Sequence, residues 1–363
     1  MYTEIIKIIE GGLSNNPDKV LNYSKHLAKK LKETGSDKLA DRITKVIQGS
    51  SGTPVYKGEL FHEPVDNETR LSIADVIFPE NNHIDIIVSK TVNQSVLDFI
   101  TLVNSREILR EKGLEINSSL LLYGPPGCGK TSMAKYIAKE LDLPLIVARL
   151  DSLISSLLGS TAKNIRKLFD YSKSKPCILF LDEFDAIAKA RDDNHETGEL
   201  KRVINSLLQN IDEFSEAGGI LIAATNHEQL LDSAIWRRFE VVVNINTPSY
   251  DEVESLIKMY FNKIQDGIEY DEKKVELLSR CLSGYSHSEI IKILNNAYYN
   301  SIIRKENLSY EELFTQYFKY KTNNHFKQDQ LIRFLNENSI SQKQISTYMN
   351  ISLRQVRNAL SEE

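Results

Sequence analysis

Eight residues near the middle of the chain have the types and spacing of a loop that binds phosphate. The loop comprises Gly124, Pro125, Pro126, Gly127, Cys128, Gly129, Lys130 and Thr131, and Ser132 follows it. An apolar run precedes it and a stretch with helical spacing follows, which is the context such a loop requires. Its glycines allow successive N–H groups to face the β- and γ-phosphates, where the helix N-terminus adds its positive end. Lys130 can reach the terminal phosphates and the Thr131 hydroxyl can bind Mg²⁺. A chance Gly/Pro turn is the weaker interpretation, so the sequence predicts a nucleoside triphosphate site.

Two carboxylates end a second apolar run. Ile178 to Leu181 have the character of a strand buried on both faces of a parallel sheet, and Asp182 and Glu183 follow at its carboxyl end. Ligands of open α/β sheets collect at that end. Asp182 would hold Mg²⁺, commonly through water, and Glu183 would polarise the attacking water. The alternative, that both residues only cap the next helix, is weakened by their pairing with the phosphate loop.

A third apolar strand, 219–226, ends at Asn226. We expect Asn226 to lie between the first two sites and to hydrogen-bond the γ-phosphate or the attacking water. Arg237 and Arg238 follow Trp236 a little further along. Taken alone, two adjacent arginines would be interpreted as a solvated charge pair.

The order of these motifs resembles that of the AAA+ ATPases, and most closely their AAA subgroup, over roughly residues 85–305. The resemblance implies an α/β fold with a RecA-like parallel sheet, an α-helical lid, ATP and Mg²⁺ as cofactors, and ATP hydrolysis. It also implies a homo-oligomeric ring, expected to be a hexamer, in which arginines reach the neighbouring subunit's nucleotide. The family usually separates its two arginines by a short insert that is missing here, so Arg237 and Arg238 are both candidates for this finger.

Three segments depart from the family pattern or leave it open. Leu157 stands where the family's first pore loop has an aromatic residue, which predicts a weaker grip on polypeptide or a different substrate; an ordinary helix boundary is the alternative. Residues 192–198 are either a second pore loop or, the favoured interpretation, a solvated loop. His287 and Ser288 replace the small residues that the family places against adenine.

Composition excludes several other classes. The chain has 363 residues, enough for two or three domains, and a formal net charge of −5, so no overall basic field attracts nucleic acid. Its three cysteines lack metal or disulfide spacing, which suits a reducing cytoplasm. No His-Glu-x-x-His motif occurs, which excludes a zinc protease of the membrane-bound relatives' type. No apolar run approaches the roughly 20 residues that span a bilayer, so we expect no membrane contact.

The pattern along the chain predicts five parts. They are a helical N-terminal module (1–48), a linker with a short extended segment (49–84), the α/β core (85–248), the helical lid (249–310) and a small C-terminal helical domain (325–363). The N-terminal module is expected to contain two or three helices with breaks at Gly11-Gly12 and at Thr34-Gly35-Ser36. Substrate selection and simple packing or oligomerisation are equally favoured as its role.

The C-terminal part has the pattern of a helix-turn-helix. Ile345, Met349, Val356 and Leu360 would face inward, Asn350 would adopt the left-handed turn conformation and Ser352 would cap the second helix. The residues left outward are Arg354, Gln355, Arg357 and Asn358, which suit the major groove of DNA. However, residues 325–363 contain five Lys or Arg against four Asp or Glu. This excess of positive charge is small for a segment that binds DNA phosphates. DNA contact is therefore possible, and protein docking or assembly is favoured.

Together these features predict Mg²⁺-dependent ATP hydrolysis by a ring that remodels or unfolds a protein client. A separately encoded protease is a further expected partner, because this chain has none. Two alternatives are a DNA-associated ATPase that acts through residues 325–363 and a nucleotide-gated scaffold or signalling switch.

Overall fold

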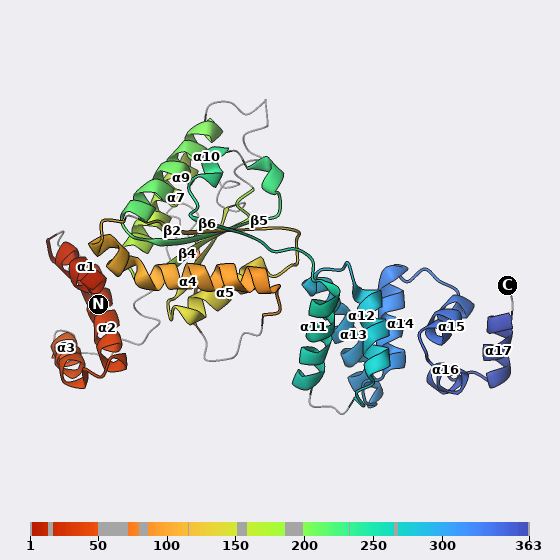
Figure 1. Cartoon of the computed structure of the whole chain (residues 1–363). Helices are drawn as coiled ribbons and strands as arrows, with labels where there is room; N and C mark the ends of the chain where they lie inside the picture. The colour runs from red at the N-terminus through yellow and green to blue at the C-terminus, as the bar shows by residue number, and fades with distance from the viewer. Residues whose placement is uncertain are drawn as a thin grey trace. The chain divides into compact units, whose positions relative to one another are not determined.

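A computed structural model describes residues 2–13, 17–49, 72–79, 86–114, 116–150, 158–185, 199–231, 233–264 and 268–361. The chain forms two compact units (Figure 1). The first consists of Met1–Ile86, Thr91–Gly124 and Lys130–Asn244. The second consists of Ile87–Lys90, Pro125–Gly129 and Ile245–Glu363, so most of the glycine loop belongs by its contacts to the helical unit.

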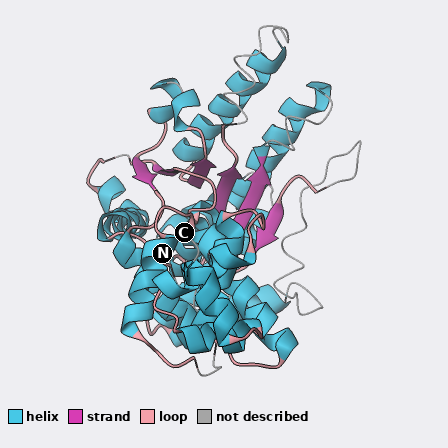
Figure 2. Ribbon diagram, turned by 90° about the vertical axis from the view of Figure 1, so that its right-hand side faces the viewer, coloured by secondary structure: helices cyan, strands magenta, loops and turns pink. Residues whose placement is uncertain are grey.

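The first unit is built on a six-stranded sheet (Figure 2). The strands are β1 (Asp75–Ile77), β2 (Ser118–Tyr123), β3 (Leu145–Arg149), β4 (Ile178–Asp182), β5 (Ile220–Thr225) and β6 (Val241–Asn244). They lie in the order β1-β3-β4-β5-β2-β6; β1 pairs antiparallel with β3 and all other pairs are parallel. The central strands are buried almost throughout, since helices cover both faces.

Helices cover the two faces of the sheet in pairs (Figure 1). One face carries α7 (Leu158–Lys173) and α9 (Glu199–Glu216), and the other carries α4 (Lys90–Glu111) and α5 (Lys130–Glu140). Leu121 packs into the core under α7 and α9, as expected from the alternation of side chains along a strand. Two short helical turns, η1 (Glu228–Leu230) and α10 (Ser233–Trp236), follow β5. This architecture confirms the predicted α/β fold class.

The N-terminal module contains three helices, α1 (Tyr2–Leu13), α2 (Pro17–Glu33) and α3 (Asp37–Gly49). The predicted break at Thr34-Gly35-Ser36 is confirmed, whereas the break predicted at Gly11-Gly12 is wrong because α1 continues to Leu13. Gly11 is buried, and a Cβ atom there would lie 3.0 Å from the Val20 side chain. This glycine therefore allows α1 and α2 to approach closely and does not end a helix.

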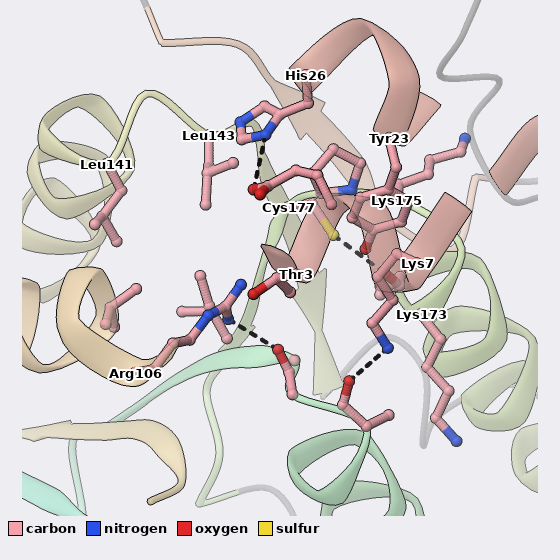
Figure 3. Close-up of a pocket in the computed structure, with 18 of the residues that line it drawn as sticks. Thr3, Lys7, Tyr23, His26, Arg106, Leu141, Leu143, Lys173, Lys175 and Cys177 are labelled. Carbon is pink, nitrogen blue, oxygen red and sulfur yellow. Dashed lines mark hydrogen bonds and ion pairs between the residues drawn. The ribbon is translucent and has the colours of Figure 1, made fainter. Parts of the chain in front are cut away.

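Polar contacts hold this module against the end of the sheet at which β3, β4 and β5 begin. The Lys7 ammonium donates to the Ala217 carbonyl (2.7 Å), and the Thr3 N–H donates to the Glu107 carboxylate (2.9 Å). Between the module and the core lies a cavity of about 180 Å³, lined by α1, α2, α4 and the loops before these strands (Figure 3). β2 is parallel to β5, so its carboxyl end lies at the other end of the sheet. The N-terminal module is therefore at the opposite end of the sheet from Tyr123, where β2 ends.

The second unit is helical. Its helices are α11 (Tyr250–Lys263), α12 (Glu272–Leu282), α13 (His287–Arg304), α14 (Tyr310–Lys321), α15 (Gln328–Glu337), α16 (Gln342–Met349) and α17 (Leu353–Ser361). One hydrophobic core extends from Val253 in α11 to Ala359 in α17. The segments predicted as lid and C-terminal domain thus share their core, with α14 between them.

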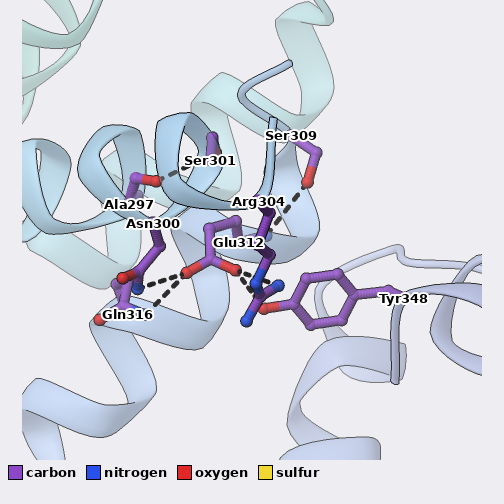
Figure 4. A network of polar contacts seen from close by, with 8 residues as sticks. All are labelled: Ala297, Asn300, Ser301, Arg304, Ser309, Glu312, Gln316 and Tyr348. Carbon is purple, nitrogen blue, oxygen red and sulfur yellow. Dashed lines mark hydrogen bonds and ion pairs between the residues drawn. The ribbon is translucent and has the colours of Figure 1, made fainter. Parts of the chain in front are cut away.

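A buried carboxylate adds a polar contact between α14 and α16. Glu312 accepts hydrogen bonds from Asn300 (2.9 Å), Arg304 (3.1 Å), Gln316 (2.8 Å) and the Tyr348 hydroxyl (2.5 Å) (Figure 4). Burial, and then the bond to Glu312, raises the pKa of Tyr348 to about 12. The phenol therefore remains a hydrogen-bond donor at neutral pH. None of the described helices is both long and apolar enough to cross a bilayer.

Candidate nucleotide site

The glycine loop has the backbone conformation expected of a phosphate cradle. Gly124, Gly127 and Gly129 all have positive φ angles (137°, 76° and 99°), which side chains disfavour. Lys130 begins α5 and is only 7% exposed. Its ammonium donates to the Gly124 carbonyl at 2.7 Å. The charge is therefore held close to the loop, in reach of a phosphate bound there.

Two oxygen donors meet at the start of α5. Thr131 is the second residue of α5 and Asp182 the last residue of β4. Their side chains are joined by a hydrogen bond of 3.1 Å from Thr131 Oγ1 to Asp182 Oδ2. A hydroxyl and a carboxylate are the hard ligands that Mg²⁺ takes together with phosphate oxygens and water. This pair fits the expected ion, and the described residues contain no cluster of three or more His, Cys, Asp or Glu that suggests another metal site.

The carboxylate predicted to activate water follows directly. Glu183 is exposed and has a φ of 55°, an uncommon conformation for a residue with a side chain. Its N–H donates to Asp182 Oδ1 at 2.9 Å. Such strain is often found where a side chain must be presented for chemistry.

Asp185 is a site residue that sequence reasoning missed. It is 4% exposed, and its Oδ1 accepts from the Thr225 hydroxyl (3.2 Å) and from the Asn226 N–H (3.4 Å). These bonds fix the end of β5, which lies between β4 and β2. Asn226 therefore stands between the strands of the two earlier motifs, as predicted. The signal was present as a third acidic residue in the run Asp182-Glu183-Phe184-Asp185.

The side chains of Arg237 and Arg238 differ in their contacts. Arg238 donates through Nε (2.8 Å) and Nη2 (2.9 Å) to both carboxylate oxygens of Asp212, and through Nη1 to the Ala234 carbonyl (2.6 Å). The Arg237 side chain is exposed and has no ion pair or hydrogen bond to any of the described residues. Among the described residues, Arg238 alone of the two arginines is thus committed to partners in its own chain. Asp212 is the partner that the sequence pattern did not single out.

The first turn of α13 contacts the glycine loop inside the helical unit. Ser288 N–H donates to the Gly127 carbonyl at 3.0 Å, and His287 Nε2 lies 3.0 Å from the Ile87 carbonyl. Burial lowers the pKa of His287, although the bond to Ile87 and the charge of Glu252 oppose the shift. The ring is therefore neutral at neutral pH and donates through Nε2.

The remaining predictions concern the pore loops and the C-terminal helices. Leu157 and residues 192–198 lie outside the described part of the chain, so both pore-loop hypotheses stay predictions. Asn350 has the predicted left-handed conformation (φ 52°, ψ 46°). The outward residues of α17 are exposed as expected, namely Arg354, Gln355, Arg357 and Asn358. Gln355 also accepts from the Ser352 N–H (2.9 Å), so part of its hydrogen-bonding capacity serves the helix cap.

Comparisons with known proteins agree with this geometry. Residues 120–247 match the family described as "ATPase family associated with various cellular activities (AAA)". The uncharacterized AAA family ATPase y4kL of Sinorhizobium fredii is 41% identical over 238 residues, which cover 66% of this chain and 70% of that protein. The proteasome-activating nucleotidase of Saccharolobus solfataricus is 36% identical over 202 residues, 54% of this chain and 51% of its own. The ATP-dependent zinc metalloprotease FtsH of Parabacteroides distasonis is 31% identical over 248 residues, 66% and 34% of the two chains.

A phosphate loop on a parallel α/β sheet and the extent of the match to y4kL define the class of protein. The chain belongs to the AAA family of ATPases, and its reaction is the hydrolysis of ATP. It spans about half the length of the proteasome-activating nucleotidase and about a third of FtsH.

Proposed function

We propose that this ATPase works as a homo-oligomeric ring, a hexamer when nucleotide is bound, and uses Mg²⁺-dependent hydrolysis to remodel or unfold a protein client. A separately encoded protease is its proposed companion. The proposal is supported by the names of two relatives, a proteasome-activating nucleotidase and a zinc metalloprotease. The proposal of a ring rests on Arg237, whose side chain is exposed and has no ion pair or hydrogen bond with the described residues of its own chain. We place the protein in the cytoplasm, which suits its three free cysteines.

The proposed roles of the residues follow from their positions. The loop from Gly124 to Ser132 would bind the phosphates of ATP, with Lys130 placed to offset charge on the transferred phosphoryl group. Thr131 and Asp182 would hold Mg²⁺, which when bound neutralises developing charge on the phosphates. Glu183 would polarise the attacking water and Asn226 would orient it. Arg237 of one subunit would stabilise the transition state in its neighbour, and Arg238 would fix the turn that carries it.

The decisive experiment measures steady-state ATPase activity against protein concentration, with and without an unstructured polypeptide, beside Glu183→Gln. The proposal expects activity per subunit to rise steeply as subunits assemble, and to rise again with the polypeptide. Glu183→Gln should still bind ATP and should lose both effects. Activity per subunit that stays constant on dilution, with loss of assembly shown independently, would contradict the ring.

A second candidate function rests on the exposed face of α17. Arg354 and Arg357 are both exposed there, directly after the left-handed turn at Asn350, and a DNA-binding helix carries such residues. Stimulation of the ATPase by duplex DNA alone, abolished when both arginines are replaced by glutamate, would favour this function. Stimulation by polypeptide alone would favour remodelling, and stimulation by neither would favour a nucleotide-gated scaffold.

A further inference from the structure

The contact between α13 and the glycine loop is made by a backbone donor that α13 itself cannot satisfy. The first N–H groups of a helix have no acceptor within the helix. In α13 the Ser288 N–H finds one in the Gly127 carbonyl (3.0 Å), and the Glu289 N–H finds one in the Ser286 hydroxyl (3.4 Å). The helix proper begins with the bond from the Ile290 N–H to the Ser286 carbonyl. The glycine loop is therefore an integral part of this helix cap.

The same bond sets the direction of one peptide group in the loop. In a trans peptide the C=O of one residue and the N–H of the next point in opposite directions. The Gly127 carbonyl points at α13, so the Cys128 N–H must point away from it. Backbone N–H groups of this loop are the donors that cradle phosphate. Holding the Gly127–Cys128 peptide thus prepares one of these donors before ATP arrives.

Residues that lie beyond the loop hold the cap in place. The Glu289 carboxylate accepts from the Ser286 N–H and hydroxyl (both 2.8 Å), which completes a capping box. Its other oxygen accepts from the Tyr320 hydroxyl of α14 at 2.9 Å. The fit against the loop is close, because a Cβ atom on Gly127 would lie 2.8 Å from Ser286 Oγ.

We propose that Ser286, Glu289 and Tyr320 are positioning residues for nucleotide binding, which act by fixing the Gly127–Cys128 peptide through the Ser288 N–H. They favour the phosphate-binding conformation of the loop in the free protein, so their loss weakens binding of ATP and ADP alike, since both carry the β-phosphate. Turnover at saturating ATP changes little, because Lys130, Asp182 and Glu183 are untouched. The inference rests on the assignment of residues 124–131 as the phosphate loop.

The test compares Ser286→Ala with Ser341→Ala in the full-length protein. Ser341 caps α16 with the same capping box, formed with Gln344, and no hydrogen bond joins it to the glycine loop among the described residues. Dissociation constants for ATP and ADP are measured by calorimetry, KM and kcat by steady-state kinetics, and stability by thermal unfolding. Ser286→Ala should raise both dissociation constants and KM about fivefold, the size of one lost cap, with kcat nearly unchanged. Ser341→Ala should lower stability similarly and leave binding unchanged.

Two more variants separate positioning from general loss of structure. Ser286→Thr keeps the hydroxyl and should restore wild-type affinity. Tyr320→Phe keeps the ring, whose centroid lies 5.7 Å from that of Tyr285, but loses the bond to Glu289, and should weaken binding about twofold. Equal dissociation constants for Ser286→Ala and Ser341→Ala would overturn the proposal. A wild-type protein that binds neither nucleotide would instead overturn the assignment of the loop.

Discussion

At the scale of single residues, the structure separates two arginines that the sequence left equivalent. Arg238 is committed to a two-pronged contact with Asp212, and a guanidinium held by both prongs is poorly available to a neighbouring subunit. Arg237, one residue earlier, is exposed. Both arginines lie in the short turn after α10, where the Arg237 N–H donates to the Ser233 carbonyl and the Arg238 N–H to the Ile235 carbonyl. The difference between their side-chain contacts assigns Arg237 to the proposed contact between subunits.

We predict that replacing Arg237 affects catalysis, whereas replacing Arg238 affects stability. Arg237→Ala should lower kcat of the assembled ATPase about 10³-fold, the usual contribution of an arginine supplied in trans, and should leave unfolding unchanged. Arg238→Ala should cost about 1 kcal/mol of stability, since its ion pair is partly exposed. Steady-state kinetics at matched assembly and urea unfolding check the pair. A kcat near that of the wild type in Arg237→Ala would refute the assignment.

At the scale of elements, local pattern predicted much of the fold. The apolar runs before the loop, before Asp182 and before Asn226 are β2, β4 and β5, because parallel strands buried on both faces must be apolar throughout. The break predicted at Gly11-Gly12 is wrong because glycine occurs both where a helix ends and where two helices approach closely, and the local sequence does not distinguish these cases. Asp185 and Asp212 were missed because their roles depend on partners 40 and 26 residues away. Such pairings follow from the sheet order, which spacing alone does not reveal.

The core shared by the lid and the C-terminal helices leads to a prediction about Tyr348. Tyr348→Phe removes one hydrogen bond to the buried Glu312 and keeps the ring, so it should cost about 1 kcal/mol. Glu312→Ala leaves several polar groups without their acceptor and should cost about 3 kcal/mol. Chemical unfolding of both variants gives the comparison. Unfolding of α15–α17 in a separate transition before the lid would contradict the shared core.

At the scale of the whole molecule, the N-terminal module is held together by an ion pair between α1 and α2 whose carboxylate is buried. Glu4 is 3% exposed and accepts from Lys30 at 2.8 Å, with His26 Nδ1 at 3.4 Å. Burial raises the pKa of Glu4, but the close contact with His26 and the hydrogen bond from Lys30 outweigh it and hold the pKa well below the ordinary 4.5. Within the module, α1 is therefore held to α2 by a negative charge that acid removes.

The sign of the pH effect follows from this lowered pKa. A carboxyl that holds its proton less tightly in the folded state stabilises the protein above its unfolded value of 4.5, and this contribution falls as pH drops below that value. Glu4→Gln should lose about 1–2 kcal/mol at pH 7. The difference in unfolding free energy between wild type and Glu4→Gln should shrink between pH 5 and about pH 3. A difference that stays constant over this range would show that the charge of Glu4 is not what stabilises the module.

The two outer strands of the sheet have a consequence for the proposed assembly of several copies of this chain. β1 has three residues and runs antiparallel to its neighbour, and β6 has four. An edge strand offers unpaired N–H and C=O groups to any other strand that approaches, and short edges limit how many such groups another chain can engage. Crowding of subunits therefore favours contacts between side chains over the growth of a continuous intermolecular sheet, so that close assembly need not turn into aggregation.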